Sequence, residues 1–588
     1  MEHSSKDMKV MENDNGITFS SSTHKKGGLR TMPFIIVNEC LEKVASYGIM
    51  PNMILYLKND YNMAIVNASN LLYTWSAMSN ILSIFGAFLS DAYLGRFLVI
   101  LIGSISSLLG LMVLWLTAMT PELRPSCGII NGLCDSATAA QLAVLILSLG
   151  LISIGAGCVR PCSIAFGADQ LSIEENSNNE RLLDSYFNWY YTSMGASTLV
   201  AFGMIVYIQE NLGWKIGFAV PAILMLISAF SFVIGSPYYV KVKASNSLLT
   251  SFVQVVVAAV KNRKINLSEC SPDQYYQGRD SEVLVPTDSL RFLNKACLIR
   301  NPVRDLKPDG SVSDPWSLCT VEKVESLKAF LSVLPMWSTS IFMAPQGSFA
   351  LLQANTMDRR LFGNFKIPAG SFSFIMVVTL SIVIPLYDRI IVPWVTKYTG
   401  RPRGFSSKFR MGIGFLFTIA SRVISSKVET VRRSAAIEQG FENQPNAEIN
   451  MSALWLAPQF VMAGFAEAFS PIGQIEFFYS YFPKSMSSFA MAMLTLGLAA
   501  GDMTGSMMVN IVDKVTSKGG NESWLSTNIN KGHLNYYYAL LTILGSINFL
   551  YFLAICWAYG PDRAEKVDSS AGKEDEQFDY MELPSSND

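Results

Sequence analysis

The chain has 588 residues, of which 50% are hydrophobic and only 15% are charged, and its net charge is −1 at pH 7. Soluble globular proteins contain about 25% charged residues, so this composition indicates a membrane protein, because the bilayer penalises charge. The near-zero net charge excludes the basic surface of a nucleic-acid-binding protein. Three scattered histidines are too few for a metal site. No nucleophile-and-base arrangement or cofactor motif indicates an enzyme, so we expect neither catalysis nor a cofactor.

Both ends of the chain are polar. Residues 1–30 lack the apolar segment of a signal peptide, so we predict a disordered cytoplasmic tail. Residues 559–588 are acidic and have the composition of a second disordered cytoplasmic tail. Kinases acting on these tails would be partners, although such tails are usually only solvated.

About 20 apolar residues are needed to cross the hydrocarbon core of a bilayer as a helix. Twelve segments of the chain qualify, in two groups of six. The first group lies near residues 32–57, 66–90, 97–118, 139–163, 186–209 and 213–235. The second lies near residues 327–352, 368–387, 411–426, 451–480, 487–513 and 535–558.

These groups predict an all-α membrane protein with an N-terminal six-helix bundle at 31–235 and a C-terminal one at 327–558. Residues 236–326 form a polar linker, in which "SLLTSFVQVVVAAVKNRK" is an amphipathic surface helix. The basic residues of this linker and of the segment after the eighth span lie on the cytoplasmic side, as the positive-inside rule requires, only if both termini are cytoplasmic. The basic residues within 427–450 would then lie outside, against the rule. Two bundles joined by a linker are typical of transporters, whose site lies between the bundles near the midplane.

Several ionisable residues interrupt the predicted spans. They are Glu39, Glu42, Lys43, Arg160, Arg422, Glu467, Glu476 and Asp502. Each costs about 2.5–3.5 kcal/mol at the bilayer centre, so such residues usually face a cavity and serve function.

Glu39, Glu42 and Lys43 share one face of the first span, because they are three and four residues apart. The lysine favours the charged form of the acids, whereas removal from water favours the protonated form. This opposition suits proton coupling. The alternative is a structural buried ion pair, which is itself weak evidence for stability.

The other intramembrane charges have different expected roles. Arg160 would attract an anion, or it would neutralise Glu39 or Glu42. Glu467 would be its partner across the bundle interface, and Glu476 would be structural. Arg422 could extend to the membrane interface, and Asp502, among small neighbours, would make a polar contact within its bundle.

The favoured inner charges are three acids, Glu39, Glu42 and Glu467, and two bases, Lys43 and Arg160. One proton would neutralise the empty site, and a bound monovalent anion would require a second. This count predicts electrogenic uptake of an anion with two protons.

Many short motifs resemble one family. "ECLEK" is similar to the first-helix motif of proton-coupled oligopeptide transporters, and "GAFLSDAYLGRF" to the loop motif of the major facilitator superfamily. The fourth and fifth helices supply "GAGCVRPCSIAFGADQ" and "SYFNWYYTSMGAS". "LLQANTMDRR", "IPAGSFSF", "LYDR", "AEAFSPIGQIEFFYSYFPKSM" and "NKGHLNYYYALL" resemble the plant nitrate and peptide transporter branch. The resemblance runs from about Gly28 to Gly560 and implies the major facilitator fold, with 12 transmembrane helices in two six-helix bundles.

The resemblance also implies roles for individual residues. Glu39, Glu42 and Lys43 match the proton-coupling motif. Tyr47, Arg160 and Glu467 match positions that face the substrate. Asp91, Gly95 and Arg96 match the gating loop, and His533 matches a structural position at the outer end of the twelfth helix.

The seventh span departs from the family pattern. "PMWSTSIFMAPQGSFALLQ" lacks the histidine with which a plant nitrate carrier of this family holds the anion. The span is also about four residues short, which would shift later side chains by about 6 Å, and Pro345 would weaken the helix. The second-half substrate contacts are therefore in doubt.

The predicted outer loops carry two candidate modifications. Cys127 and Cys134 flank "GIINGL" and could form a disulfide in an oxidising compartment. Asn521, in "NES", is a glycosylation acceptor that the topology places outside, whereas Asn266, in "NLS", would be inside and unmodified.

The prediction is a proton-coupled symporter that takes up nitrate by alternating access, driven by the proton gradient. The alternatives are transport of a hormone (gibberellin, abscisic acid or auxin), another organic anion or a peptide, or a transceptor with weak transport. We expect a multi-pass membrane protein in the plasma membrane, with the vacuolar membrane as the alternative.

Overall fold

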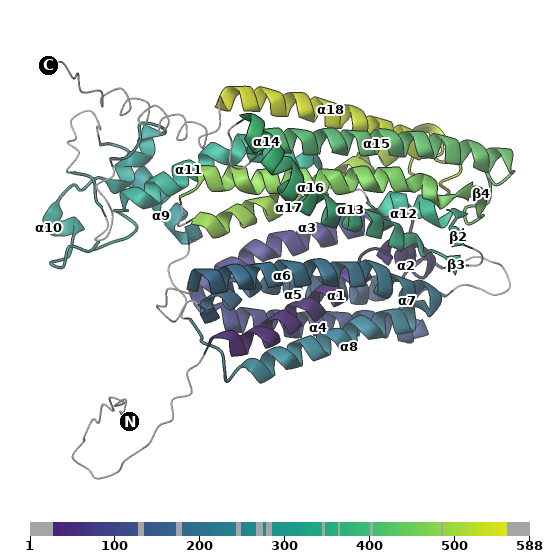
Figure 1. Cartoon of the computed structure of the whole chain (residues 1–588), viewed down its shortest axis with the longest axis horizontal. Coiled ribbons are helices and arrows are strands. Elements are labelled where there is room, and N and C mark those ends of the chain that lie inside the picture. Colours follow the sequence, from purple (N-terminus) through teal and green to yellow (C-terminus); the bar gives the residue numbers. More distant parts are fainter. Residues whose placement is uncertain are drawn as a thin grey trace, which may run out of the picture.

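The computed structural model describes residues 27–126, 135–171, 179–242, 248–265, 274–277, 285–343, 347–362, 365–399, 404–483 and 486–560. These residues are mostly helical, and the helices form two layers (Figure 1). The lower layer, drawn in purple and blue, is the first half of the chain. The upper layer, drawn in green and yellow, is the second half.

The first half contains the helices at the six predicted positions, three of which are interrupted or extended by turns of other types. They are α1 (Met32–Ile49) with α2 (Met53–Asn59), α3 (Ile65–Leu89) with η2 (Ser90–Leu94), α4 (Arg96–Met119), α5 (Ala139–Leu171), α6 (Asn179–Val200) with η4 (Ala201–Ile205) and α7 (Val206–Asn211), and α8 (Gly213–Gly235). The short 3-10 turns η1 (Leu29–Thr31) and η3 (Pro121–Leu123) flank them.

The second half contains helices at the other six positions. They are α11 (Val321–Ser338) with η7 (Thr339–Met343) and α12 (Gly347–Asn355), η8 (Ala369–Phe372) with α13 (Ser373–Leu386), η9 (Tyr387–Ile391) and α14 (Val392–Thr399), α15 (Ser407–Glu438), η10 (Ala453–Leu456) with α16 (Ala457–Tyr481), α17 (Ser487–Thr516) with η12 (Lys518–Gly520), and α18 (Leu534–Tyr559).

The linker lies against the second half. It contains α9 (Leu248–Lys261), η6 (Arg291–Cys297) and α10 (Pro302–Asp305). The ring of Phe252 in α9 stacks on Phe330 of α11, with centroids 5.5 Å apart. The amphipathic segment therefore forms a helix whose apolar residues pack partly on protein.

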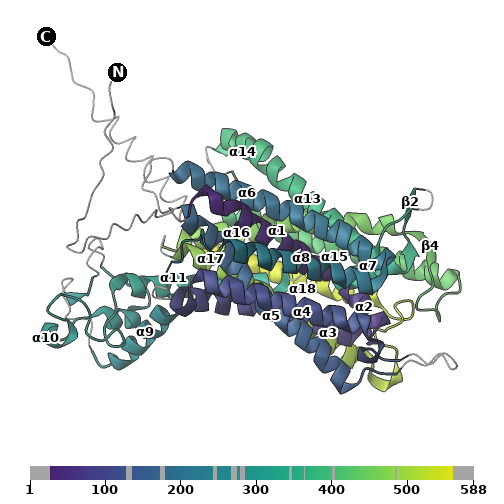
Figure 2. The same ribbon diagram turned by 90° about the horizontal axis from the view of Figure 1, so that it is seen from below.

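The two ends of the molecule differ. The start of α1, the end of α18 and the linker helices lie at one end, which we call the linker end (Figures 1 and 2). The opposite end, the strand end, carries two short sheets. Strand β1 (Met357–Asp358) pairs in parallel with β4 (Ile449–Ser452), and β2 (Arg360–Phe362) pairs antiparallel with β3 (Phe365–Lys366).

Nine helices in the described part of the chain are long and apolar enough to span a membrane. The three predicted spans that fall outside this set contain α1, α11 and α16, each of which carries several ionisable residues. The expected all-α membrane fold is confirmed, and the ionisable residues of these three helices lower their hydropathy below that of the other spans.

The apolar core shows how the halves meet. One cluster at the strand end contains residues of both halves, such as Tyr56 and Trp75 with Phe349 and Val509. At the linker end, the larger clusters each belong to one half, the second with its linker. The halves are therefore packed together through a shared core at the strand end.

Candidate functional site

The acids of α1 are buried in the first half. Glu39 is 1% exposed and Glu42 is fully buried. The hydroxyl of Ser46 donates a hydrogen bond of 2.6 Å to Glu42 Oε1. The carboxylate oxygens of Glu39 face the hydroxyls of Ser163 and Tyr190, but they have no partner that meets hydrogen-bond geometry among the described residues. Both acids thus keep oxygens that can accept a proton.

Tyr47 lies between two cations. Lys43 Nζ is 4.7 Å from the centroid of the Tyr47 ring, and the guanidinium carbon of Arg160 is 5.1 Å from the same centroid. Arg160 also interacts electrostatically with Glu39 and Glu42. The structure therefore brings together five of the six residues predicted for proton coupling and substrate binding.

These charges do not form ion pairs in this conformation. Within the described residues, neither Lys43 nor Arg160 has a carboxylate oxygen within 4 Å, and Arg160 Nε is buried without a hydrogen-bond partner. Two structural alternatives were expected for these residues: a buried ion pair within α1, and neutralisation of Glu39 or Glu42 by Arg160. Both require a direct ion pair. Neither contact is made here.

Glu467 in α16 lies apart from this cluster. It is partly buried, and among the described residues it has no hydrogen bond or ion pair, including with Arg160. The expected contact between Glu467 and Arg160 across the halves is absent from this conformation. The carboxylate of Glu467 remains available to a ligand.

Three further intramembrane charges have protein partners. Glu476 forms an ion pair with Arg410, as its structural role predicts. Arg422 does not extend to the membrane interface, because its guanidinium donates to the carbonyl oxygens of Phe342 at 2.8 Å and Leu541 at 3.3 Å. Asp502 contacts Asn80 of the first half, so the prediction of a contact within its own bundle is wrong.

The predicted gating loop lies at the linker end of the first half. Gly95 has a φ of 78°, a left-handed conformation that favours glycine, and it turns the chain between η2 and α4. Arg96 Nε is 3.7 Å from Asp91, while its Nη1 contacts both oxygens of Asp169 at 2.6 Å. Sequence reasoning missed Asp169, although it stands inside the quoted motif of the fourth helix.

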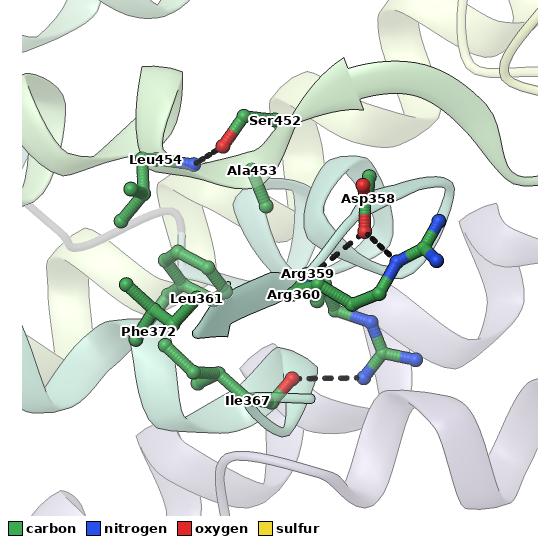
Figure 3. Close-up of a pocket in the computed structure, with 9 residues that line it drawn as sticks. All are labelled: Asp358, Arg359, Arg360, Leu361, Ile367, Phe372, Ser452, Ala453 and Leu454. Atoms are coloured by element: carbon green, nitrogen blue, oxygen red, sulfur yellow. Dashed lines mark hydrogen bonds and ion pairs between the residues drawn. The ribbon is translucent and has the colours of Figure 1, made fainter. Parts of the chain in front are cut away.

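A contact between the halves at the strand end was also missed. Arg359, in the segment after α12, forms an ion pair with Glu210 of α7. Glu210 also accepts a hydrogen bond of 3.0 Å from the backbone of Ala369. Figure 3 shows Arg359 held by the carbonyl oxygen of Ile367, at 3.2 Å, beside the ion-paired Asp358 and Arg360. We call the Glu210–Arg359 pair the strand-end latch.

The seventh helix is broken. α11 contains Pro335 and ends at Ser338, η7 continues as a 3-10 turn, and α12 begins at Gly347. Pro345 lies outside the described residues, so its expected effect is not described. The break places the helix's later side chains on a separate short helix.

Two of the remaining predicted positions, His533 and Asn521, lie at the strand end. His533 precedes α18, and its ring stacks on Tyr536 with centroids 4.8 Å apart. Asn521 is exposed in the loop after α17, as a glycosylation acceptor requires. Cys127, Cys134 and Asn266 lie outside the described residues. In the part of the chain that the structure describes, no group of three acidic, cysteine or histidine side chains could hold a metal ion.

Comparisons of this chain with family models and with known proteins agree with one another. A family model described as the POT family matches residues 97–525. The chain is 52% identical over 547 residues to Protein NRT1/PTR FAMILY 1.2 of Arabidopsis thaliana, covering 91% of this chain and 90% of that protein. It is 51% identical over 564 residues to Protein NRT1/PTR FAMILY 1.1 of Arabidopsis thaliana, covering 94% and 95%.

Solved structures show a similar fold at lower identity. An auto-inhibited POT family peptide transporter has a TM-score of 0.64 and 19% identity, covering 91% of this chain and 98% of that one. The POT family transporter PepTSo has a TM-score of 0.63 and 16% identity, covering 89% and 98%.

Proposed function

Because this chain belongs to the POT family, and so is a membrane transporter rather than an enzyme, we propose that it is a proton-coupled symporter of a small anion, with nitrate favoured. The observation that carries the proposal is the arrangement around Tyr47, with Lys43 and Arg160 on its ring and no carboxylate within 4 Å of either cation among the described residues. A cation held away from water with no carboxylate in direct contact attracts an anion.

The coupling step follows from the acids beside these cations. Glu39 and Glu42 are buried and have oxygens without hydrogen-bond partners among the described residues. Binding of an anion at Lys43 and Arg160 would reduce the positive potential that these acids feel, so it would favour proton uptake. Proton and anion would therefore bind together and cross together.

Alternating access between the two halves would complete the cycle. The shared core and the strand-end latch hold the halves together at one end. Release at that end, with closure at the linker end, would expose the site to the other side. With the termini cytoplasmic, as the charge distribution predicts, the strand end is the outer end, and we place the protein in the plasma membrane.

The test is two-electrode recording in oocytes, with nitrate applied at acidic and at neutral outside pH. We expect an inward current that grows with acidity and is lost in Glu39→Gln. Glu438→Gln, which neutralises an exposed acid at the end of α15, is the matched control and should behave like the unmodified chain. The absence of nitrate current and of nitrate uptake, with protein present at the surface, would contradict the nitrate proposal.

Stoichiometry adds a second readout. The charge count of the inner site gives two protons with each bound nitrate, so each nitrate should carry one net positive charge inward when the empty site returns without a proton. Labelled nitrate uptake measured under voltage clamp gives this ratio directly. A ratio of zero charges for each nitrate would mean that the empty site returns with one proton, which would contradict the two-proton coupling but would leave nitrate transport itself in place.

A peptide is the second candidate, because Glu467 has no partner among the described residues. A zwitterionic peptide would place its amino group at Glu467 and its carboxylate at Arg160. Dipeptides should then compete with nitrate, and Glu467→Gln should remove dipeptide uptake while sparing the uptake of labelled nitrate. Gibberellin, abscisic acid and auxin, applied in the same assay, test the organic-anion alternatives.

A further inference from the structure

Asp502 is an acid of α17 whose side chain faces the other half. It is 6% exposed. The amide of Asn80 in α3 donates a hydrogen bond of 3.4 Å to its Oδ2, and the hydroxyl of Ser76, one turn away, lies near this carboxylate. None of the described cations forms an ion pair with it. The proposed function assigns it no role.

The surroundings of Asp502 form a polar seam between the halves. The amide of Asn70 donates to Asn510 Oδ1 at 2.8 Å, and the hydroxyl of Ser506 donates to Asn70 Oδ1 at 2.9 Å. A side chain at Gly505 would have its Cβ 3.0 Å from the Tyr73 ring, so the two helices touch. We call these residues of α3 and α17, with Asp502, Asn80 and Ser76, the α3–α17 seam.

The groups around Asp502 provide no positive charge in contact with it. Tyr73 of α3 is the titratable neighbour that interacts with it, and Arg422 of α15 and Tyr537 and Tyr538 of α18 also act on Tyr73. η7 contributes no ionisable residue to the neighbourhood. Glu467 and Glu476 of α16 are not among the groups that interact with Asp502, and the charged residues of α11 lie in its first turns, at the linker end.

These surroundings suit a neutral acid. A buried carboxylate ion without a cation is costly in a membrane protein, whereas a protonated carboxyl fits a site of amide and hydroxyl groups. Alternating access requires the seam to open, because it joins the two halves between the middle of the protein and the strand end. In the open seam Asp502 would meet water, where an aspartate is ionised near neutral pH.

We propose that Asp502 binds a proton each time the α3–α17 seam closes and returns it to the same side when the seam opens. Acidity on the strand-end side therefore favours the conformation that is closed on that side. This proton differs from those of Glu39 and Glu42, because it is not carried across the membrane. The proposal rests on the alternating-access transport proposed above, but neither of its tests uses a substrate.

The first test is infrared spectroscopy of the purified full chain in lipid nanodiscs during a pH titration. We expect a carbonyl band of a protonated carboxyl that grows as pH falls, is missing in Asp502→Asn and is retained in Glu438→Gln. Equal bands in the unmodified chain and in Asp502→Asn would overturn the proposal.

The second test measures the conformation with spin labels at two exposed positions of the strand end, Leu212 in the first half and Leu454 in the second. The accessible native cysteines are replaced, and labelling is done at one fixed pH. As pH falls, the short-distance population should grow, with an open-to-closed ratio that changes by up to about tenfold per pH unit for one proton.

Asp502→Asn imitates the neutral acid, so it should show the short distance at every pH. The control Glu438→Gln should keep the pH dependence of the unmodified chain. A pH-independent distance in the unmodified chain, or an unchanged pH dependence in Asp502→Asn, would overturn the proposal. So would failure of Asp502→Asn to fold when Asp502→Glu folds, since the ionised form would then be required. If the unmodified chain gives both expected results but transports no nitrate, that outcome contradicts the proposed function and not the role of Asp502.

Discussion

At the scale of single residues, Tyr47 holds two cations in place. Lys43 and Arg160 come from different helices, α1 and α5, and both lie over the same ring. A cation on an aromatic face is stabilised by about 0.5–2 kcal/mol, more when it is removed from water. The ring therefore keeps two like charges close together without a carboxylate in contact among the described residues.

We predict that Tyr47→Leu weakens anion binding, because both cations lose the ring that positions them. The half-saturating nitrate concentration should rise by about 2- to 30-fold, which corresponds to the range of one cation–π interaction. Dose–response currents in oocytes measure it. Tyr47→Phe keeps the ring and is the matched control, so equal effects of the two substitutions would contradict the role of the ring.

His533, just before α18, should make stability depend on acidity. Burial, with Arg433 nearby, lowers the pKa of this imidazole. Because the folded pKa lies below that of the unfolded chain, stability is complete above about pH 6.5 and falls as pH decreases through the shifted value. Thermal unfolding of the purified chain at mildly acidic and neutral pH should show this loss, and His533→Gln should reduce it. An equal acid sensitivity in the variant would assign the effect to other groups.

At the scale of elements, the break in the seventh helix has a dedicated partner. A 3-10 turn between α11 and α12 leaves carbonyl oxygens without regular helical donors. Arg422 of α15 donates to the carbonyl oxygen of Phe342 in that turn and to that of Leu541 in α18. One arginine thus joins three elements of the second half, which explains a charge in the middle of a spanning helix.

We predict that Arg422→Met destabilises the second half by about 1.5–3 kcal/mol, because two carbonyl oxygens lose hydrogen bonds from a charged donor. Thermal unfolding in nanodiscs measures it. Arg422→Lys keeps a charge but lacks the planar fork that reaches two carbonyl groups, so its effect should be intermediate. An unfolding midpoint for Arg422→Met at or above that of the unmodified chain would show that the break needs no such support.

At the scale of the whole molecule, the latch between Glu210 and Arg359 joins the two halves at the strand end, where they also share a core. The Arg359 side chain is 11% exposed and that of Glu210 is 28% exposed. The pair is screened only partly by water, so its coupling should exceed the few tenths of a kcal/mol that are common for surface pairs.

We predict that Glu210→Gln and Arg359→Gln each shift the population toward the open strand end by about fivefold, from a coupling of about 1 kcal/mol. The distance between labels at Leu212 and Leu454 measures this shift. The double variant should add little to either single variant, because the two residues act on one contact. Strictly additive effects would mean that the two residues act independently.

The amino-acid sequence by itself determined the helical membrane fold, the two groups of six helices and the ionisable residues that matter. A helix that spans a bilayer needs an apolar run of a fixed length. A charge within such a run costs free energy, so a charged residue there can be recognised in the sequence as unusual. For the same reason Glu39, Glu42, Lys43 and Arg160 could be identified from the apolar runs that contain them. Arg432, one of the basic residues that count against the predicted topology, is fully buried in an ion pair with Glu429.

Only the tertiary structure decided which groups contact each charged side chain. Four contacts join distant parts of the chain: Arg422 with the broken seventh helix, Asp169 with Arg96, Glu210 with Arg359, and Asp502 with Asn80. Hydropathy shows that a segment is buried but not which neighbour it faces. The partner depends on helix rotation and on how the two halves pack, so contacts between separate helices and between the halves appear only when the chain is folded.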